Sequence, residues 1–128
     1  MTKPTILVVD DEPLMTNIVS EVGKFGGFDV IETNSAREFQ GAWQNHNPTV
    51  VIIDLVMPDM DGVELLKWLS EHKYFAPVIL MSGYDKNYLE TASTVGTEKG
   101  NTIIGTLFKP FRLSELETLL NKTLSSYQ

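Results

Sequence analysis

The chain has 128 residues, the length of one domain, and 42% of them are hydrophobic, which is enough to build a core without covalent staples. It contains no cysteine, so a disulfide framework, cysteine-ligated zinc and thiol catalysis are excluded. With 17 acidic and 10 basic residues the net charge is −7, which argues against general binding to a nucleic acid backbone.

Five short apolar runs alternate with amphipathic segments along the chain. In order, the runs are ILVVD (6–10), FDVIET (28–33), VVIID (50–54), PVILMS (77–82) and TIIGTLF (102–108). All except the second are almost continuously hydrophobic, as strands are when both faces of a parallel sheet are covered. The strict alternation predicts a doubly wound α/β domain with five parallel strands and five helices.

Helix start signals lie between the runs. Pro13 suits the first turn of the helix that follows the first run. Residues 35–38 and 114–117 both read Ser-x-x-Glu, the spacing of a capping box in which each side chain bonds a backbone amide of the other residue. In the last segment one helical stripe is formed by Leu113, Leu116, Leu120 and Leu124.

Polar residues interrupt the apolar pattern where four of the predicted strands end. Asp10 and Asp11 follow the first run, and Asp54 ends the third. Ser82 ends the fourth run, and Lys109 follows the fifth. Ligands of open α/β sheets bind beyond the carboxyl ends of the strands, where the winding reverses. With strand order 2-1-3-4-5, the three aspartates would form one acidic pocket, with the serine and the lysine along its far wall.

The three carboxylates predict a site for a hard cation. Two like charges about 4 Å apart repel by roughly 4 kcal/mol at an effective dielectric of about 20. With oxygen ligands and no candidate histidine nearby, Mg²⁺ suits the site best. The alternative is that strand-end acids are solvated or stabilise a helix N-terminus, which fits Asp11 or Glu12 taken alone. We favour the metal site, because chance would have to bring four strand ends together.

Four segments of the chain resemble the receiver domain of two-component response regulators. They are VVDDE (8–12), IIDLVMPDMDG (52–62), MSG (81–83) and FKPF (108–111). They occur in family order and the resemblance covers essentially the whole chain. The long second segment and the Lys109-Pro110 pair are specific, whereas a pair of aspartates alone would be weak.

The resemblance implies roles for individual residues. Asp54 would accept a phosphoryl group from a sensor histidine kinase or a phosphotransfer protein. Ser82 would receive a phosphoryl oxygen, Lys109 would pair with the phosphoryl group, and the Lys109-Pro110 bond would be cis. Mg²⁺, or Mn²⁺ in its place, would be held by Asp11, Asp54, the backbone carbonyl of Val56 and, through water, Asp10.

A receiver would be a signalling phosphoprotein and not an enzyme, because it catalyses only its own phosphorylation and dephosphorylation. The resemblance implies that phosphorylation switches the face made by the fourth helix, the fifth strand and the fifth helix. That face would then engage an output domain or a target protein, or support a phosphorylation-dependent dimer. We expect no direct binding to nucleic acid or membrane by this domain.

The chain departs from the family pattern at two places. Receivers commonly have Tyr or Phe three residues before the lysine, and this chain has Thr106. The aromatic half of the usual switch is therefore in question, and neither Tyr84 nor Phe108 is an equivalent replacement. The segment 84–102 also looks longer than in compact receivers, which would lengthen the fourth helix or the loop after it.

Three rival functions share parts of this pattern. A flavodoxin-like carrier would need a small polar phosphate loop where this chain has DDEP, which would repel flavin phosphate. A haloacid-dehalogenase-type phosphatase usually has a second Asp two residues after the nucleophile, a place that Val56 occupies. The remaining alternative is a degenerate receiver that acts as a phosphorylation-independent docking module, which the presence of all five site residues disfavours.

The rest of the chain predicts a single domain. There is no repeat, low-complexity tract or linker, so we expect one domain over residues 1–128 with a core at about 4–124. The absence of an 18-residue apolar stretch and of a signal core favours a cytoplasmic location. The remaining histidines and tryptophans are expected to be exposed at helix ends or packed against the sheet: His46, His72, Trp43 and Trp68.

Overall fold

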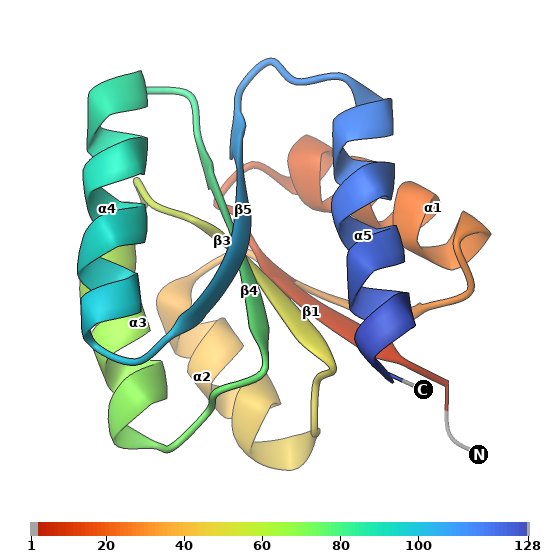
Figure 1. The fold of residues 1–128 in the computed structure, drawn as a ribbon, viewed down its shortest axis with the longest axis horizontal. Helices are drawn as coiled ribbons and strands as arrows, with labels where there is room; N and C mark the ends of the chain where they lie inside the picture. The colour runs from red at the N-terminus through yellow and green to blue at the C-terminus, as the bar shows by residue number, and fades with distance from the viewer. Residues whose placement is uncertain (1–2, 128) are drawn as a thin grey trace.

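A computed structural model describes residues 3–127, which form a central parallel sheet between two layers of helices (Figure 1). Strands and helices alternate without exception, as the pattern of apolar runs predicts. In chain order the elements are β1 (Thr5–Val9), α1 (Pro13–Phe25), β2 (Asp29–Thr33), α2 (Ala36–Asn45), β3 (Val50–Asp54), α3 (Gly62–Glu71), β4 (Pro77–Ser82), α4 (Lys86–Glu98), β5 (Thr102–Phe108) and α5 (Leu113–Tyr127).

The strand order is β2-β1-β3-β4-β5 and every pair is parallel, so the predicted doubly wound topology is confirmed. The third, fourth and fifth strands have the predicted bounds. β1 ends one residue earlier than the first apolar run, so Asp10 lies just beyond the strand. Because Val9 pairs with Ile53, Asp10 and Asp54 are brought to the same edge of the sheet.

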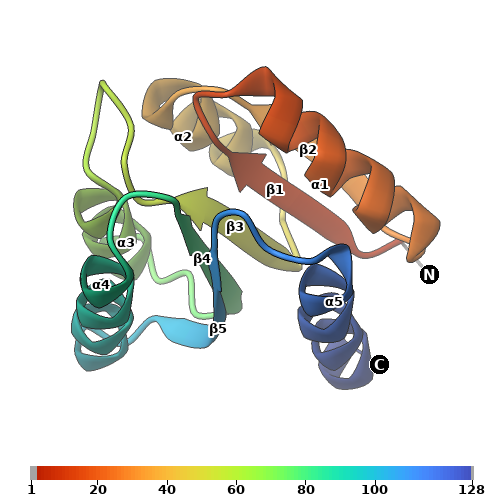
Figure 2. The same cartoon turned by 90° about the horizontal axis from the view of Figure 1, so that it is seen from above.

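The core has two halves, one on each face of the sheet (Figure 2). α2, α3 and α4 cover one face, where they pack on alternate strand residues such as Leu7 and Ile53. α1 and α5 cover the other face and pack on the strand residues that alternate with these, such as Val8 and Ile52. Strands buried on both faces need apolar side chains in both directions, which explains their continuous hydrophobic runs.

β5 lies at the edge of the sheet and is less buried than its apolar sequence predicts. Of its seven residues only Leu107 is buried. Close packing against α5 depends on Gly105, because a Cβ there would lie 2.4 Å from a methyl carbon of Leu119. β5 and the helices beside it therefore leave part of this edge accessible.

One predicted capping box is half formed, because the Glu38 side chain accepts from the Asn34 amide and not from that of Ser35, and the other is wrong. Ser35 precedes α2, and its hydroxyl accepts from the Glu38 amide at 3.1 Å. α5 begins at Leu113, so Ser114 lies inside the helix. There the glutamate that reaches back is Glu115, which accepts from the Arg112 amide at 2.7 Å. The leucine stripe is buried at Leu116 and Leu120, while Leu113 remains 51% exposed.

The histidines and tryptophans gather at the C-terminal ends of α2 and α3. His46 and His72 are exposed, and each places its Nδ1 within 3 Å of the carbonyl oxygen four residues earlier. The rings of Trp43 and Trp68 meet edge to face, with their centroids 5.2 Å apart, and the ring centroid of His72 lies 4.1 Å from that of Trp68. Within residues 3–127 no helix is long and apolar enough to span a membrane.

Candidate functional site

Three aspartates converge beyond the carboxyl ends of β1 and β3. Asp10, Asp11 and Asp54 each place a carboxylate oxygen within 4.8 Å of the others. Asp10 and Asp54 are buried, whereas Asp11 is exposed. The parallel register of β1 and β3 places them together, because the two strands end side by side. The predicted acidic pocket is therefore present in the fold.

Asp10 is the most firmly held of the three. One of its carboxylate oxygens accepts from the Glu12 amide at 2.9 Å, and its backbone carbonyl accepts from the Asn34 side chain at 2.9 Å. Its other carboxylate oxygen accepts from Lys109 Nζ at 2.5 Å. With both oxygens engaged, Asp10 suits a role through water, and the exposed Asp11 is free to bind a cation directly.

Lys109 closes the far side of the acidic cluster. Its Nζ lies 3.6 Å from Asp54 Oδ1 and 3.9 Å from Glu12 Oε1, in addition to its bond to Asp10. Burial disfavours the charged lysine, but the hydrogen bond and charge of Asp10 and the charges of Asp54 and Glu12 outweigh it and raise the pKa of Lys109. The Lys109-Pro110 bond is cis, as the resemblance implies.

The pKa of Asp54 is raised from its ordinary 3.8 to about 7, and burial is the largest cause. Repulsion by Asp10 and, to a smaller extent, by Asp11 contributes to this rise. Lys109 and a hydrogen bond from the Val56 backbone lower it, but only in part. A buried carboxylate that is under-neutralised in this way is poised to gain a cation or to keep a proton.

Ser82 ends β4 beside this cluster and is fully buried. Its hydroxyl accepts from the Tyr84 amide at 3.2 Å, and its backbone carbonyl accepts from the Lys109 amide at 2.8 Å. A cleft of about 360 Å³ opens next to it, lined by Asp11, Glu12, Asp54, Val56, Gly83, Tyr84 and Lys109. All five predicted site residues therefore lie in or beside one cleft.

Loop 55–61 carries Val56 and forms one wall of the site. A hydrogen bond joins its two ends: the Gly62 amide donates to the Leu55 carbonyl at 2.9 Å. A Cβ at position 62 would lie 2.6 Å from Leu55 Cα, so this approach requires glycine. Further along, Asp59 accepts from the amides of Ala36 and Arg37 at the start of α2.

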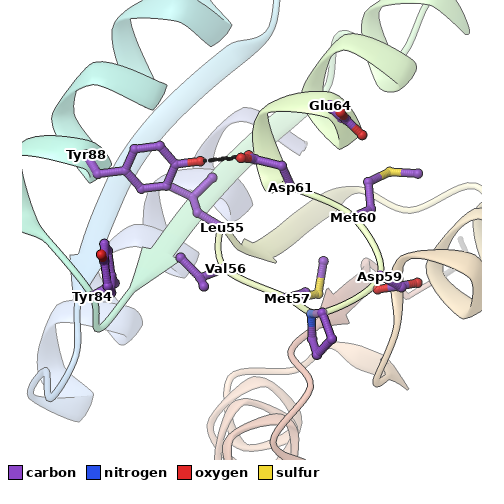
Figure 3. A pocket seen from close by; sticks show the side chains of 10 residues that line it. Leu55, Val56, Met57, Asp59, Met60, Asp61, Glu64, Tyr84 and Tyr88 are labelled. Atoms are coloured by element: carbon purple, nitrogen blue, oxygen red, sulfur yellow. Dashed lines mark hydrogen bonds between the residues drawn. The ribbon is translucent and has the colours of Figure 1, made fainter.

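A contact that the sequence does not predict links this loop to α4. The Tyr88 hydroxyl lies 2.7 and 2.8 Å from the two carboxylate oxygens of Asp61, which also caps α3 by accepting from the Val63 amide (Figure 3). The two side chains border a pocket of about 520 Å³ that shares Val56 and Tyr84 with the acidic cleft. Sequence reasoning missed Tyr88, because one tyrosine in a helical pattern has no signal of its own.

Thr106 is exposed on β5 and leaves a hollow where the family commonly has an aromatic ring. The hollow measures about 300 Å³ and lies between α4, β5 and α5. It is lined by Lys86, Leu89, Glu90, Thr106, Phe108, Pro110 and Glu115. The departure noted in the sequence therefore coincides with a surface hollow that Thr106 and Phe108 border.

The residues of the cleft fit Mg²⁺. The donors are carboxylate oxygens, two of them buried and one open to solvent, and the cluster carries more negative charge than Lys109 and its neighbours balance. Such a set matches a hard divalent ion that keeps several of its waters. Receiver domains bind Mg²⁺ at an acidic pocket of this kind.

Fold and site together define the class: a doubly wound α/β domain of CheY-like architecture with an acidic cleft at its switch point. The chain belongs to the response regulator receiver domain family, whose model matches residues 6–121. It is thus a receiver domain of a two-component response regulator.

Individual relatives place it within that family. The chain is 33% identical to the regulatory protein AtoC of Escherichia coli over 120 residues, which cover 93% of the chain and 25% of AtoC. It is 26% identical to the chemotaxis protein CheY of Bacillus subtilis, covering 94% of the chain and 97% of CheY. The high-resolution structure of the chemotaxis response regulator CheY4 of Vibrio cholerae superposes with a TM-score of 0.81 at 25% identity, covering 95% and 99% of the two chains. The chain thus spans a quarter of AtoC but nearly all of CheY.

Proposed function

We propose that Asp54 accepts a phosphoryl group from a sensor histidine kinase or a phosphotransfer protein, and that this phosphorylation changes what the face of α4, β5 and α5 binds. The observation that carries the proposal is the position of Asp54. It is a buried carboxylate with a pKa of about 7, clustered with two other aspartates and 3.6 Å from the ammonium group of Lys109.

Phosphoryl transfer needs positioning and charge neutralisation more than covalent assistance. A carboxylate oxygen of Asp54 attacks phosphorus as the bond from phosphorus to the donor's histidine nitrogen breaks, which leaves an acyl phosphate on Asp54. Mg²⁺, when bound, lowers the repulsion between the carboxylate and the incoming phosphoryl group. Asp11, Asp54 and the Val56 carbonyl would hold the ion directly, and Asp10 through water.

Two residues of the cleft respond to the new group. Lys109 already carries its charge beside Asp54, so it turns from Asp10 to a phosphoryl oxygen over a short distance. The Ser82 hydroxyl accepts from the Tyr84 amide before phosphorylation, and it donates to a phosphoryl oxygen afterwards. Its movement draws the β4–α4 connection toward Asp54, which biases the position of α4.

The proposed partners follow from this change. AtoC is a regulatory protein four times longer than the segment it shares with the chain, whereas CheY is matched over almost its whole length. By analogy, the switched face engages an output domain of the same protein or a separate target, or a second phosphorylated copy. We propose that residues 1–128 act as one cytoplasmic receiver unit that needs no nucleic acid or membrane contact of its own.

A docking module that works without phosphorylation is the second candidate. One observation favours it: Thr106 supplies no ring to occupy the hollow between α4 and β5, so the usual aromatic part of the switch is missing. The same face would then bind its partner with equal affinity whatever the state of Asp54.

Intact-mass spectrometry after incubation with acetyl phosphate and Mg²⁺ tests the phosphoacceptor. The wild-type chain should gain one phosphoryl group, and Asp54→Asn should gain none. Because some receivers refuse small donors, a negative result is repeated with the cognate kinase. A chain that stays unmodified by both donors would be a docking module.

A further inference from the structure

The contact between Tyr88 and Asp61 joins two segments that are 27 residues apart in sequence. Asp61 is the last residue of loop 55–61, and Tyr88 lies in the first turn of α4. In Figure 3 the tyrosine ring reaches across the top of the pocket to the carboxylate. Tyr88 is half-buried; burial, together with the hydrogen bond and charge of Asp61, raises the pKa of Tyr88 to about 12. The hydroxyl therefore keeps its proton and remains a donor throughout the physiological range.

Loop 55–61 is otherwise fixed to the sheet, α2 and α3. The Leu55 amide donates to the Met81 carbonyl, Asp59 accepts from the start of α2, and Asp61 caps α3. Among the hydrogen bonds of residues 3–127, only the one from Tyr88 connects this loop to α4. The same loop carries Val56, two residues after Asp54, and ends at Asp61, so one short segment joins the phosphorylation site to an anchor on α4.

The N-terminal half of α4 also borders a surface hollow on the side of β5. Lys86, Leu89 and Glu90 line this hollow beside Thr106, which measures about 300 Å³. The Leu89 side chain itself is buried in the core. The first turn of α4 is thus hydrogen-bonded to Asp61 on the side of α3, and the hollow lies on the side of β5, whereas nearer its C-terminal end α4 packs closely on Ile103 at Gly96. A helix held in this way can shift when its one hydrogen-bonded anchor on loop 55–61 is displaced.

We propose that Tyr88 is a positioning residue that couples the loop beside Asp54 to α4, and so takes a role for which Thr106 offers no side chain. The proposal rests on the proposed function of Asp54. A ligand that moves Val56 also moves Asp61, and the tyrosine hydroxyl carries that displacement into the first turn of α4. Coupling between two sites is reciprocal, so a partner bound on α4 also changes the affinity of the Asp54 site for its ligands.

Hydrogen exchange with and without Mg²⁺ and beryllofluoride tests the coupling. Tyr88→Phe removes the hydroxyl and keeps the ring, Asp61→Asn weakens the acceptor, and the double variant combines them. Thr94→Val is the matched control, because it removes an α4 hydroxyl whose hydrogen bond goes to Glu90 inside the same helix. Beryllofluoride stands in for the phosphoryl group on Asp54.

In the wild type and in Thr94→Val, the ligands should slow exchange in residues 55–62, 82–85 and 86–98. In Tyr88→Phe the response of 55–62 and 82–85 should remain, and that of 86–98 should fall by about fivefold, within the usual range of coupling between sites. Because both substitutions act on the same hydrogen bond, the response of residues 86–98 in the double variant should be no smaller than in either single variant. An undiminished response of α4 in Tyr88→Phe would overturn the proposal.

The ligand-free proteins provide a second comparison that does not depend on phosphorylation. Tyr88→Phe should speed exchange at both ends of the contact, in loop 55–61 and in the first turn of α4, while Thr94→Val should speed it in α4 alone. If the wild type fails to respond to Mg²⁺ and beryllofluoride at all, the proposed function of Asp54 is wrong and this comparison decides the coupling. Faster exchange at only one end, or at neither, would then contradict it.

Discussion

The ammonium group of Lys109 lies 2.5 Å from a carboxylate oxygen of Asp10, a residue with no exposed surface. The same group is 3.6 Å from Asp54, so one cation serves two buried anions. In the metal-free protein this pairing offsets part of the repulsion within the cluster, and it keeps the lysine beside the atom that is proposed to receive a phosphoryl group.

Replacing Lys109 should therefore affect both stability and chemistry. Lys109→Ala leaves Asp10 buried without its cation, and we expect the free energy of unfolding in EDTA to fall by about 2 kcal/mol or more. Phosphorylation by acetyl phosphate should be slowed, or should no longer alter α4. Urea unfolding measures the first effect, and Lys67→Ala on the exposed surface of α3 is the control. Equal loss in both variants would contradict the assigned role.

The pKa of Asp54 gives a pH dependence with a definite sign. Because the pKa is raised to about 7 in the folded chain, from an ordinary 3.8, folding retains a proton that the unfolded chain releases. The contribution of the Asp54 carboxyl to the free energy of unfolding is therefore complete below about pH 4 and is lost as the pH rises toward 7. Asp54→Asn should therefore be more stable than wild type in EDTA, by up to about 4 kcal/mol at pH 7, since one pKa unit is worth roughly 1.4 kcal/mol.

Thermal or urea unfolding of the two proteins between pH 4 and pH 8 measures this difference. The stability gap should widen up to about pH 7 and then level off. A gap that stays constant across the range would mean that the Asp54 carboxylate is already ionised at pH 4 in the folded protein.

Mg²⁺ should stabilise the folded chain, because it binds where three carboxylates converge and the unfolded chain has no such site. At a concentration 100 times the dissociation constant the gain is about 2.7 kcal/mol. Asp11→Ala should lose most of this gain, since Asp11 is the exposed aspartate open to a direct bond. Melting curves with and without millimolar Mg²⁺ provide the measurement; an unmoved wild-type curve would argue against the metal site.

Gly62 and Gly41 provide a matched pair of substitutions at helical positions. A Cβ at Gly62 would lie 2.6 Å from Leu55 Cα and 2.7 Å from a methyl carbon of Leu55, so Gly62→Ala should cost about 1–3 kcal/mol and displace loop 55–61. A Cβ at Gly41 meets nothing within 4 Å, so Gly41→Ala in α2 should stabilise by roughly 0.5–1 kcal/mol. Urea unfolding distinguishes the two, and a stabilising Gly62→Ala would show that the loop is not tightly packed.

Much of the fold follows from the apolar runs, because burial on both faces imposes a pattern that local sequence displays directly. β3, β4 and β5 have their predicted bounds, and the strand ends identify the cluster at Asp10, Asp11 and Asp54. Helix boundaries were less predictable. Two glutamates near Ser114 compete for the free amides at the start of α5, and Glu115 is the one that reaches Arg112.

The contact of Tyr88 with Asp61 could not be predicted, for a different reason. It depends on the distance between α3 and α4, which is set by the packing of Leu65, Leu66 and Leu89 and not by spacing in the sequence. The low exposure of the central strands was predictable from their residues. The exposure of β5 follows only from the predicted strand order, because an edge strand can be as apolar as a central one.

Borohydride trapping tests the central claim most directly. The chain is phosphorylated in the presence of Mg²⁺, reduced with borohydride, which converts a phosphorylated aspartate to homoserine, and mapped by peptide mass spectrometry. The account predicts homoserine at position 54 in the wild type and in Lys67→Ala, and at no position in Asp54→Asn. Homoserine at position 10 or 11 in the wild type, or a phosphoryl group that maps to a side chain other than Asp54, would contradict it.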